Sequence, residues 1–357
     1  MKIVTIIGAR PQFIKAAVVS KEIKNNKKIN EVIVHTGQHF DSNMSDIFFE
    51  QMGIPKPNYQ LEISGLTHGA MTGRMLEEIE KILLKEQPDY VMVYGDTNST
   101  LAGALAASKL NIKVAHVEAG LRSFNMSMPE EQNRILTDRI SSVLFCPTKS
   151  SLINLDSEGY ESLNIDILKV GDVMQDSVLF YKNYSKSPDD IDVDKFDNGF
   201  ILSTVHRAEN TDDPDRLRFI VSALNKVHES TPVVLPLHPR TRNKIAALGL
   251  DLEVHVIEPV GYLEMLYLLD NCSMVMCDSG GLQKEAYFFG KPCITMRDET
   301  EWVELVEVNA NVIVGASFEK ITSAYEKMKN VEVTDDEHLY GGGNASKAIV
   351  DYFCNQR

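Results

Sequence analysis

Short apolar runs rich in β-branched residues alternate with helical patterns along almost the whole chain of 357 residues. Such alternation predicts strand–helix–strand units with right-handed crossovers and parallel sheets, which bind ligands at the carboxyl ends of their strands. In the first half, the expected strands cover residues 3–7, 31–35, 90–94, 114–117 and 142–145. In the second half, they cover residues 200–204, 233–237, 254–257, 274–277 and 293–296.

Two series of strands in a chain of this length predict two domains, and two doubly wound Rossmann-like domains facing a cleft fit the pattern best. We expect an N-terminal domain of residues 1–170 plus 345–357, because a glycine-rich hinge at 341–343 precedes a last helix that returns to it. The expected C-terminal domain comprises residues 171–344. A segment rich in Asp, Lys and Pro at 184–199 is expected to be a surface connection near the boundary.

The composition excludes several classes of protein. The net charge of −15, from 36 basic and 51 acidic residues, argues against a nucleic-acid partner, although a few Arg and Lys side chains can still bind a small anion. The five cysteines lack metal-ligand spacing, so we expect reduced thiols and no metal site. Every apolar run is too short for a signal peptide or a membrane span, which predicts a cytoplasmic protein without membrane contact.

The best candidate for phosphate binding follows the expected strand at 274–277. Ser279, Gly280 and Gly281 form a turn that opens a helical pattern, and free backbone N–H groups at a helix N-terminus can bind a phosphate. Glu285, one turn further along, is within reach of a ribose hydroxyl. An ordinary tight turn would explain the glycine pair as well, so the other motifs must decide.

Cationic and imidazole side chains follow three of the expected strands. Arg10 and Lys15 occur where the first strand leads into a helix, either as cations for a diphosphate or as solvated charges on a capped helix. His206 and Arg207 follow the first strand of the second series and form a plausible anion clamp. His238 ends the next strand.

Three carboxylates are expected at one edge of the first sheet. Asp96 and Glu118 follow the third and fourth strands, and Glu130 opens a helical pattern that carries Arg134 four residues later. Each has an ordinary alternative, because Asp96 could cap a turn, Glu118 could pair with Arg122, and Glu130 could complement a helix dipole. Together they are typical of acid/base machinery that moves a proton on two faces of a substrate.

These motifs together resemble the non-hydrolysing UDP-N-acetylglucosamine 2-epimerase family. The resemblance covers essentially the whole chain in order, through Gly8-x-Arg10-Pro11, Gln38-His39, Gly95-Asp96-Thr97, His116-Val117-Glu118-Ala119-Gly120-Leu121-Arg122, Pro129-Glu130-Glu131-x-Asn133-Arg134, His206-Arg207, Asp278-Ser279-Gly280-Gly281 and Met296-Arg297-Asp298. It implies the two-domain glycosyltransferase-B fold, with the carboxylates on the first domain and UDP on the second. It also implies a homodimer that needs no metal and no other cofactor.

The resemblance further implies a role for each matching position. The implied catalytic residues are Asp96, Glu118, Glu130 and His206. The implied UDP-sugar-binding residues are Arg10, Lys15, Arg134, Arg207, His238, Ser279, Gly280, Gly281, Glu285 and Arg297, and His206 also contributes to UDP binding. The implied reaction removes the C2 proton and expels UDP from C1. UDP then adds back to the resulting glycal while a proton is delivered to the opposite face of C2.

Two segments, 123–128 and 301–304, depart from the commonest pattern of the family. Both resemble the subgroup that converts UDP-2,3-diacetamido-2,3-dideoxy-D-glucuronate into its mannuronate epimer for surface polysaccharide such as O-antigen or capsule. Candidate cations for the C6 carboxylate of this substrate are Arg122, Arg242 and Lys284. Residues 65–67 lack a basic residue that regulated members carry nearby, so allosteric activation by UDP-N-acetylglucosamine is not expected.

Other functions remain open at this point. One alternative is epimerisation of UDP-N-acetylglucosamine to UDP-N-acetylmannosamine, and another is an inverting glycosyltransferase of the same fold. A hydrolysing epimerase would release UDP and free sugar. A UDP-sugar sensor would bind the nucleotide without using the carboxylates.

Overall fold

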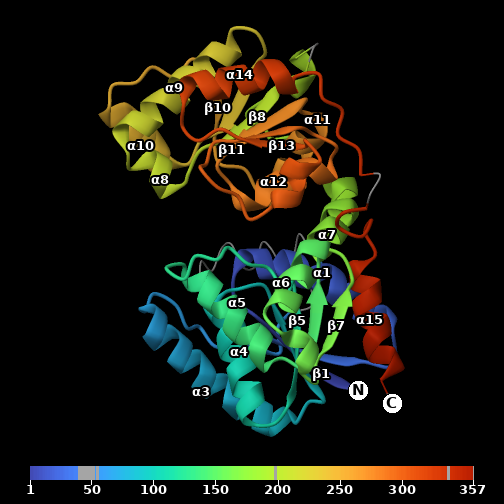
Figure 1. Cartoon of the computed structure of the whole chain (residues 1–357). Helices are drawn as coiled ribbons and strands as arrows, with labels where there is room; N and C mark the ends of the chain where they lie inside the picture. The colour runs from blue at the N-terminus through green and yellow to red at the C-terminus, as the bar shows by residue number, and fades with distance from the viewer. Residues whose placement is uncertain (39–52, 54–55, 197–198, 336–337, 357) are drawn as a thin grey trace. The chain divides into compact units, whose positions relative to one another are not determined.

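The chain forms two units, each built around one parallel sheet (Figure 1). The computed structural model describes residues 1–38, 53, 56–196, 199–335 and 338–356, apart from the side chain of Arg10. The first unit comprises Met1–Ser177 and His338–Arg357, and the second comprises Val178–Glu337. The predicted fold class, with doubly wound parallel sheets, is confirmed.

The sheet of the first unit has the strand order β3-β2-β1-β4-β5-β6-β7. Its strands are β1 (Lys2–Ile7), β2 (Asn30–His35), β3 (Tyr59–Gln60), β4 (Tyr90–Tyr94), β5 (Lys113–Val117), β6 (Val143–Cys146) and β7 (Asp166–Lys169). β1 pairs in parallel with both β2 and β4, so the chain order reverses at β1. Ligands of doubly wound sheets bind beside such a reversal, at the carboxyl ends of the strands.

Helices cover both faces of this sheet (Figure 1). Val4 and Ile6 of β1 are fully buried and pack with residues of α3 and α4, because alternate residues of a strand share one face. α5 packs beside α4, and α15 packs against α1. The helices are α1 (Arg10–Asn25), α3 (His68–Glu86), α4 (Asn98–Lys109), α5 (Pro129–Ile140), α6 (Lys149–Ser157), α7 (Val173–Tyr181) and α15 (Ala345–Asn355).

The C-terminal helix α15 completes the core of the first unit. The ring centroid of Phe353 lies 5.1 Å from that of Tyr90 and 5.8 Å from that of Phe145. Asp176 of α7 accepts hydrogen bonds from two backbone N–H groups at the start of α15, at 3.1 and 2.7 Å. This carboxylate therefore caps α15 from a distant part of the chain.

The sheet of the second unit has the strand order β10-β9-β8-β11-β12-β13, so the chain order reverses at β8. Its strands are β8 (Ile201–Thr204), β9 (Val233–Pro236), β10 (His255–Ile257), β11 (Met274–Cys277), β12 (Cys293–Thr295) and β13 (Asn311–Ile313). Its helices are α8 (Ala208–Thr211), α9 (Pro214–His228), α10 (Pro239–Ala247), α11 (Tyr262–Asn271), α12 (Gly280–Phe288), α13 (Val303–Glu307) and α14 (Phe318–Met328).

Local sequence explains why these helices begin where they do. The Asp213 carboxylate accepts hydrogen bonds from two N–H groups of the first turn of α9, and Pro214 occupies the first helical position. Leu217, Ile220 and Leu224 of α9 are buried against the sheet, at helical spacing. Among the described residues, every helix is too short or too polar to cross a bilayer.

Candidate active site

Asp96 lies at the carboxyl end of β4, in a turn that begins with Gly95. Arg134 of α5 holds its carboxylate: the Nε atom donates to Asp96 Oδ2 at 3.0 Å, and Nη2 lies 2.7 Å from the same oxygen. Although the Asp96 side chain is 32% exposed, burial raises its pKa above the ordinary aspartate value, against the lowering effect of Arg134 and Lys15. Asp96 therefore holds a proton more readily than a free aspartate.

Glu118 lies at the end of the neighbouring strand β5, in an unusual backbone conformation. Its φ angle is +71°, in the left-handed region that non-glycine residues rarely adopt and that occurs often in active sites. Its carboxylate contacts Lys15 Nζ of α1, and both side chains are buried. The alternative ion pair of Glu118 with Arg122 is therefore replaced by one with Lys15.

Gly95 brings the two strand ends together. A Cβ atom at this position would lie 3.3 Å from Glu118 Oε2 and 3.5 Å from Lys15 Nζ, and the φ angle of Gly95 is +61°. A larger residue would therefore be strained and would crowd the ion pair. The carboxylates of Asp96 and Glu118 are close enough to interact, since the charge of Glu118 contributes to the raised pKa of Asp96.

The first turn of α5 carries two glutamates in different environments. Glu130 is exposed, whereas Glu131 is fully buried. Glu131 pairs with Arg134 at 2.6 Å and accepts hydrogen bonds from the backbone N–H groups of Ser123 and Phe124 at 3.0 and 2.9 Å. Burial tends to raise the pKa of Glu131, but these hydrogen bonds and the Arg134 charge together lower it. Sequence reasoning missed Glu131, although its i,i+3 spacing to Arg134 was a usable signal.

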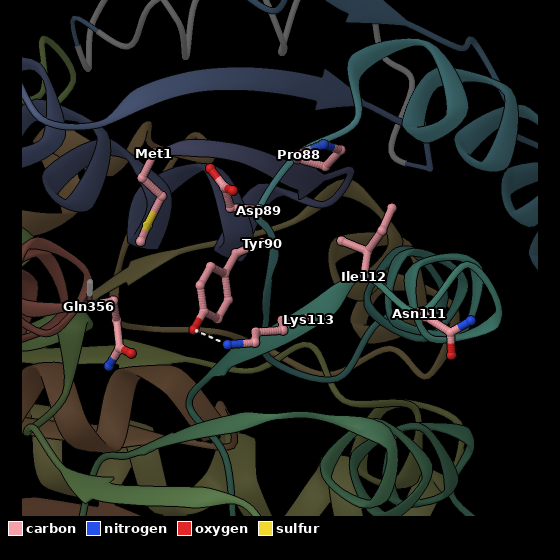
Figure 2. Close-up of a pocket in the computed structure, with 8 residues that line it drawn as sticks. All are labelled: Met1, Pro88, Asp89, Tyr90, Asn111, Ile112, Lys113 and Gln356. Atoms are coloured by element: carbon pink, nitrogen blue, oxygen red, sulfur yellow. Dashed lines mark hydrogen bonds between the residues drawn. The ribbon is translucent and has the colours of Figure 1, made fainter.

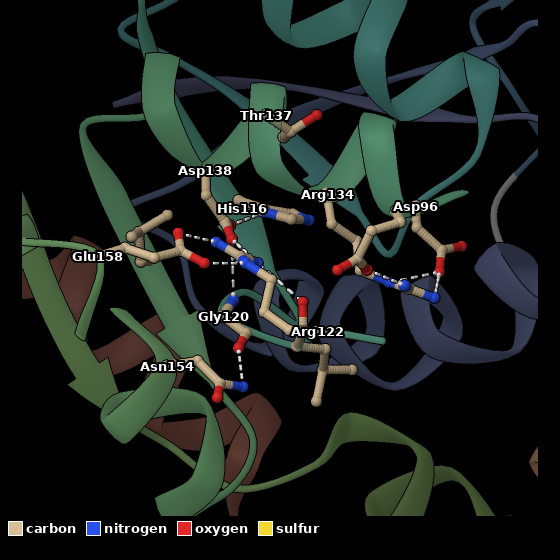
Figure 3. A network of polar contacts seen from close by, with 12 residues as sticks. Asp96, His116, Gly120, Arg122, Arg134, Thr137, Asp138, Asn154 and Glu158 are labelled. Atoms are coloured by element: carbon tan, nitrogen blue, oxygen red, sulfur yellow. Dashed lines mark hydrogen bonds and ion pairs between the residues drawn. The ribbon is translucent and has the colours of Figure 1, made fainter. Parts of the chain in front are cut away.

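A buried polar network lies behind these strand ends (Figure 3). His116 of β5 and Asp138 of α5 are fully buried, with His116 Nδ1 2.7 Å from Asp138 Oδ1. Arg122 donates to Asp138 Oδ2 at 2.7 Å and to both carboxylate oxygens of Glu158 at 2.6 and 2.8 Å. Arg122 is thus committed to two carboxylates of its own unit, which leaves it poorly suited to bind a substrate carboxylate.

In the second unit, the buried carboxylate of Asp278 ties the end of β11 to the end of β8. It accepts hydrogen bonds from the backbone N–H groups of His206 and Arg207 at 3.0 and 2.9 Å and from Asn210 Nδ2 at 3.2 Å. His206 Nδ1 lies 3.2 Å from Asp278, and the His206 side chain is 51% exposed. The imidazole is therefore anchored on one edge and open to solvent on another.

The Ser279-Gly280-Gly281 turn begins α12 directly after β11. The Ser279 hydroxyl accepts a weak hydrogen bond from the Leu282 N–H at 3.4 Å and is the N-cap. Among the described residues, no atom lies within 4 Å of a Cβ placed on Gly281. The start of α12 is therefore uncrowded beside Gly281, and the N–H groups of the first turn of a helix suit a phosphate.

The segment after β12 packs directly against this turn. Trp302 Nε1 donates to the Gly280 carbonyl at 2.9 Å, and Lys284 Nζ lies 3.9 Å from the centroid of the Trp302 ring. Arg297 is almost fully buried and donates to Glu301 Oε2 at 2.8 Å. Burial tends to raise the pKa of Glu301, but the charges of Arg297 and Arg207 and hydrogen bonds to its carboxylate together lower it.

A family model for UDP-N-acetylglucosamine 2-epimerase matches residues 21–353. The chain belongs to the UDP-N-acetylglucosamine 2-epimerase family. It is 63% identical, over 99% of each chain, to the UDP-2,3-diacetamido-2,3-dideoxy-D-glucuronate 2-epimerase of Pseudomonas aeruginosa. It is 44% identical, over 98% of each chain, to the UDP-N-acetylglucosamine 2-epimerase of Methanocaldococcus jannaschii.

Solved structures of the epimerase family share the fold. The crystal structure of the M. jannaschii UDP-GlcNAc 2-epimerase in complex with UDP-GlcNAc and UDP has a TM-score of 0.86 at 43% identity, and the match covers 100% of both chains. The enzyme of Neisseria meningitidis bound to UDP-GlcNAc has a TM-score of 0.85 at 32% identity, also over 100% of both chains. The predicted family and glycosyltransferase-B-like fold are therefore confirmed.

The remaining residues suggested by the epimerase motifs follow β1, β2 and β9 or lie in α12. His238 is the exposed N-cap of α10, and Glu285 lies in the second turn of α12. Arg10 begins α1, but its side chain lies outside the described part of the structure, as does His39. Gln38 accepts hydrogen bonds from the Ser99 N–H and hydroxyl at 3.0 and 2.7 Å. No metal-binding cluster of His, Cys, Asp and Glu occurs among the described residues.

A hollow of about 550 Å³ lies at the other end of the strands of the first sheet, where β1, β4 and β5 begin (Figure 2). Lys113 Nζ lies 3.4 Å from Tyr90 Oη on its wall. Because Asp96 and Glu118 follow the other ends of β4 and β5, this hollow is separate from the candidate active site.

Proposed function

We propose that the chain is a non-hydrolysing UDP-sugar 2-epimerase that acts on UDP-2,3-diacetamido-2,3-dideoxy-D-glucuronate and forms the mannuronate epimer. The observation that carries the reaction type is the pair of carboxylates at the ends of β4 and β5. One, Asp96, has a raised pKa, and the other, Glu118, contacts a lysine. The 63% identity to a relative named for this substrate supports the choice of sugar.

The proposed UDP site is built chiefly from residues of the second unit. The first-turn N–H groups of α12 and its positive dipole end suit the β-phosphate, with Ser279, Gly280 and Gly281 at the closest approach. His206 supplies a side chain to the same phosphate, and Glu285 a carboxylate to the ribose. The set is completed by Arg10, Arg207, His238 and Arg297.

The proposed chemistry uses the first unit. Glu118, kept charged by Lys15, takes the C2 hydrogen as a proton, and the C2–H electron pair forms the C1=C2 double bond. The C1–O bond breaks and its electrons pass to the β-phosphate oxygen of UDP. UDP then attacks C1 of the glycal while Asp96, which holds a proton more readily than a free aspartate, delivers a proton to the opposite face of C2. Glu130, exposed at the start of α5, is proposed to exchange protons with solvent.

The contacts of Lys15 and Arg134 suggest a role other than the UDP-sugar binding that the motifs implied. Lys15 contacts Glu118, and Arg134 bonds Asp96 and Glu131. We propose that both act chiefly by holding the two reacting carboxylates, rather than by binding the diphosphate alone.

Turnover in D2O tests the proposal. The epimer should carry deuterium at C2, because Glu118 takes the original proton and Asp96, a different group, delivers the new one. Product without deuterium at C2 would sink the elimination mechanism. Stoichiometric UDP and free sugar would indicate a hydrolysing epimerase, and epimer formation that requires an acceptor is incompatible with the proposal.

The substrate is tested separately, with UDP-N-acetylglucosamine as the competitor because relatives named for that sugar are 44% identical to this chain. We expect kcat/KM to favour the diacetamido glucuronate by at least about tenfold, the effect of one well-placed polar contact. Equal kcat/KM values would reject the sugar assignment while leaving the reaction type intact.

A further inference from the structure

The buried carboxylate of Asp138, in the third turn of α5, contacts β5 and the loop after it directly and the loop after β4 through His116 (Figure 3). Its Oδ1 atom lies 2.7 Å from His116 Nδ1. Its Oδ2 atom accepts hydrogen bonds from the Gly120 N–H at 3.1 Å and from Arg122 Nη1 at 2.7 Å. These direct contacts all lie within residues 116–122, and His116 extends them to the loop after β4.

The first arm of this connection leads to Asp96. His116 Nε2 lies 2.7 Å from the carbonyl oxygen of Gly95, and a carbonyl oxygen can only accept, so Nε2 donates. This bond fixes the peptide group that directly precedes Asp96. On the far side of Asp96, Asn133 of α5 donates to the Asp96 carbonyl at 2.9 Å. The backbone of Asp96 is thus held from both directions.

The second arm leads to Glu118. Gly120, whose N–H binds Asp138, lies two residues after Glu118, and the φ angles of the two residues are +78° and +71°. Asn154 also donates to the Gly120 carbonyl at 3.0 Å. A left-handed backbone at a non-glycine residue persists only where surrounding contacts hold it. Asp138 supplies one of those contacts.

The network is chemically costly for a role in stability alone. Asp138, His116 and the Arg122 side chain are fully buried, and burying charged groups carries a desolvation penalty that often cancels their mutual attraction. A satisfied network of this kind does, however, fix geometry tightly. Its two arms end beside Asp96 and Glu118.

We propose that His116 and Asp138 are positioning residues, which set the placement of Asp96 relative to Glu118 by holding both strand ends from one helix. This inference rests on the proposed epimerase function. The hydrogen bond from His116 to Gly95 is its central link, because without it the peptide before Asp96 loses its only side-chain bond among the described residues.

Two substitutions at the same position separate the two bonds of the imidazole. In H116Q, the amide nitrogen can reach the place of Nε2 and still donate to Gly95. In H116N, the shorter amide can reach only the place of Nδ1, so the bond to Asp138 survives and the bond to Gly95 is lost. Both variants leave a polar group in the same cavity, so they are matched in size class and polarity.

We expect H116Q to keep kcat within about tenfold of the wild type and H116N to lose about 100-fold, the effect of a misplacement near 1 Å. UDP affinity measured by calorimetry should be unchanged in both, because neither bond of His116 is made to a proposed UDP-binding residue. The thermal unfolding midpoint is measured alongside. If the network served only stability, the kcat values of the two variants would fall with their thermal unfolding midpoints, whichever hydrogen bond of residue 116 is retained.

Equal kcat values in H116Q and H116N would overturn the proposal, as would a loss of UDP affinity that parallels kcat. If neither variant folds, D138N decides. Its amide oxygen can still accept from Gly120 and Arg122, and its NH2 group can donate to His116 Nδ1, so Nε2 keeps its hydrogen for Gly95. We expect kcat within about tenfold of the wild type, and a folded D138N with about a 100-fold loss would overturn the proposal.

The wild-type chain separates this inference from the function on which it rests. If the wild type forms no C2-deuterated epimer in D2O, the proposed function fails. If the wild type turns over and H116Q and H116N have equal kcat values, only the positioning role fails.

Discussion

Lys15 on α1 and Glu118 at the end of β5 are 103 residues apart in the sequence and form an ion pair inside the first unit. Their side chains are only 10% and 8% exposed. In such surroundings each charge depends on the other, because water is largely excluded. Lys15 thereby keeps Glu118, the proposed base, ionised and fixes its position, although Lys15 lies on the helix that follows β1.

Replacing Lys15 by Met should lower the free energy of unfolding by about 3 kcal/mol, since Glu118 loses its lysine while remaining buried. The double variant K15M/E118Q should lose less than the sum of the two single variants, because the uncompensated charge is gone. Urea unfolding of the four proteins measures this coupling. Strictly additive losses would show that the two side chains do not depend on each other.

Asp96→Asn should abolish most turnover while leaving UDP binding intact. The amide keeps the size of the side chain but cannot deliver the proton, so we expect kcat to fall by about 10²-fold to 10⁴-fold. Calorimetric titration with UDP provides the control. Retained turnover would indicate another proton donor, whereas a UDP-sugar sensor would show no turnover even in the wild type.

Gly95→Ala should impair both stability and turnover. The alanine would have to adopt a φ angle of +61°, and its Cβ would lie 3.3 Å from Glu118 Oε2. We expect a loss of about 1–2 kcal/mol in the free energy of unfolding, with a fall in kcat.

Gly73→Ala is the matched control for Gly95→Ala. Gly73 lies inside α3, and no described atom is within 4 Å of an added Cβ. Alanine there should stabilise the helix by up to about 1 kcal/mol and leave kcat unchanged. Equal effects of the two substitutions would contradict the role given to Gly95.

Phe124 is expected to carry backbone strain. Its φ angle is +56°, its side chain is 74% exposed, and its N–H is held by Glu131. Phe124→Gly should therefore be more stable than Phe124→Ala by about 0.5–1 kcal/mol, because glycine alone adopts this conformation without a steric penalty. Thermal unfolding of the pair measures the difference, and an alanine variant as stable as the glycine variant would exclude strain.

Glu31 should make stability depend on pH. Burial raises the pKa of its carboxyl, against hydrogen bonds from Thr5 and Ser20 that lower it. A group whose pKa is raised on folding stabilises the fold below its unfolded pKa, and that contribution is lost as pH rises through the folded value. Glu31→Gln has no such loss, so its advantage over the wild type should be larger at pH 8 than at pH 4. A difference in unfolding free energy that is independent of pH would contradict this assignment.

The strands were predictable because buried parallel strands are continuous apolar runs, and every strand expected from the sequence has a counterpart. The short strands β3, β7 and β13 were missed. β3 and β13 are edge strands of two and three residues, and β7 is an edge strand without a buried residue. The predicted strand ends also placed Asp96, Glu118 and Ser279 correctly beyond the carboxyl ends of strands.

The spacing of residues in the sequence could not predict which charged side chains form ion pairs. Glu118 and Arg122 are close in sequence, yet Glu118 pairs with Lys15 and Arg122 with Asp138 and Glu158. An ion pair forms where the fold brings side chains together, and that depends on tertiary packing. For the same reason, helical spacing could not decide which of the two adjacent glutamates of α5 would be buried.

The position of α15 has a consequence for the order in which the protein is assembled. The second unit is one continuous stretch of chain, whereas the first lacks α15 until the second unit has been synthesised. Until then, Tyr90 and Phe145 lack the Phe353 ring that packs on them. The unit whose synthesis begins first is therefore the one that must wait until the whole second unit has been synthesised to close its core.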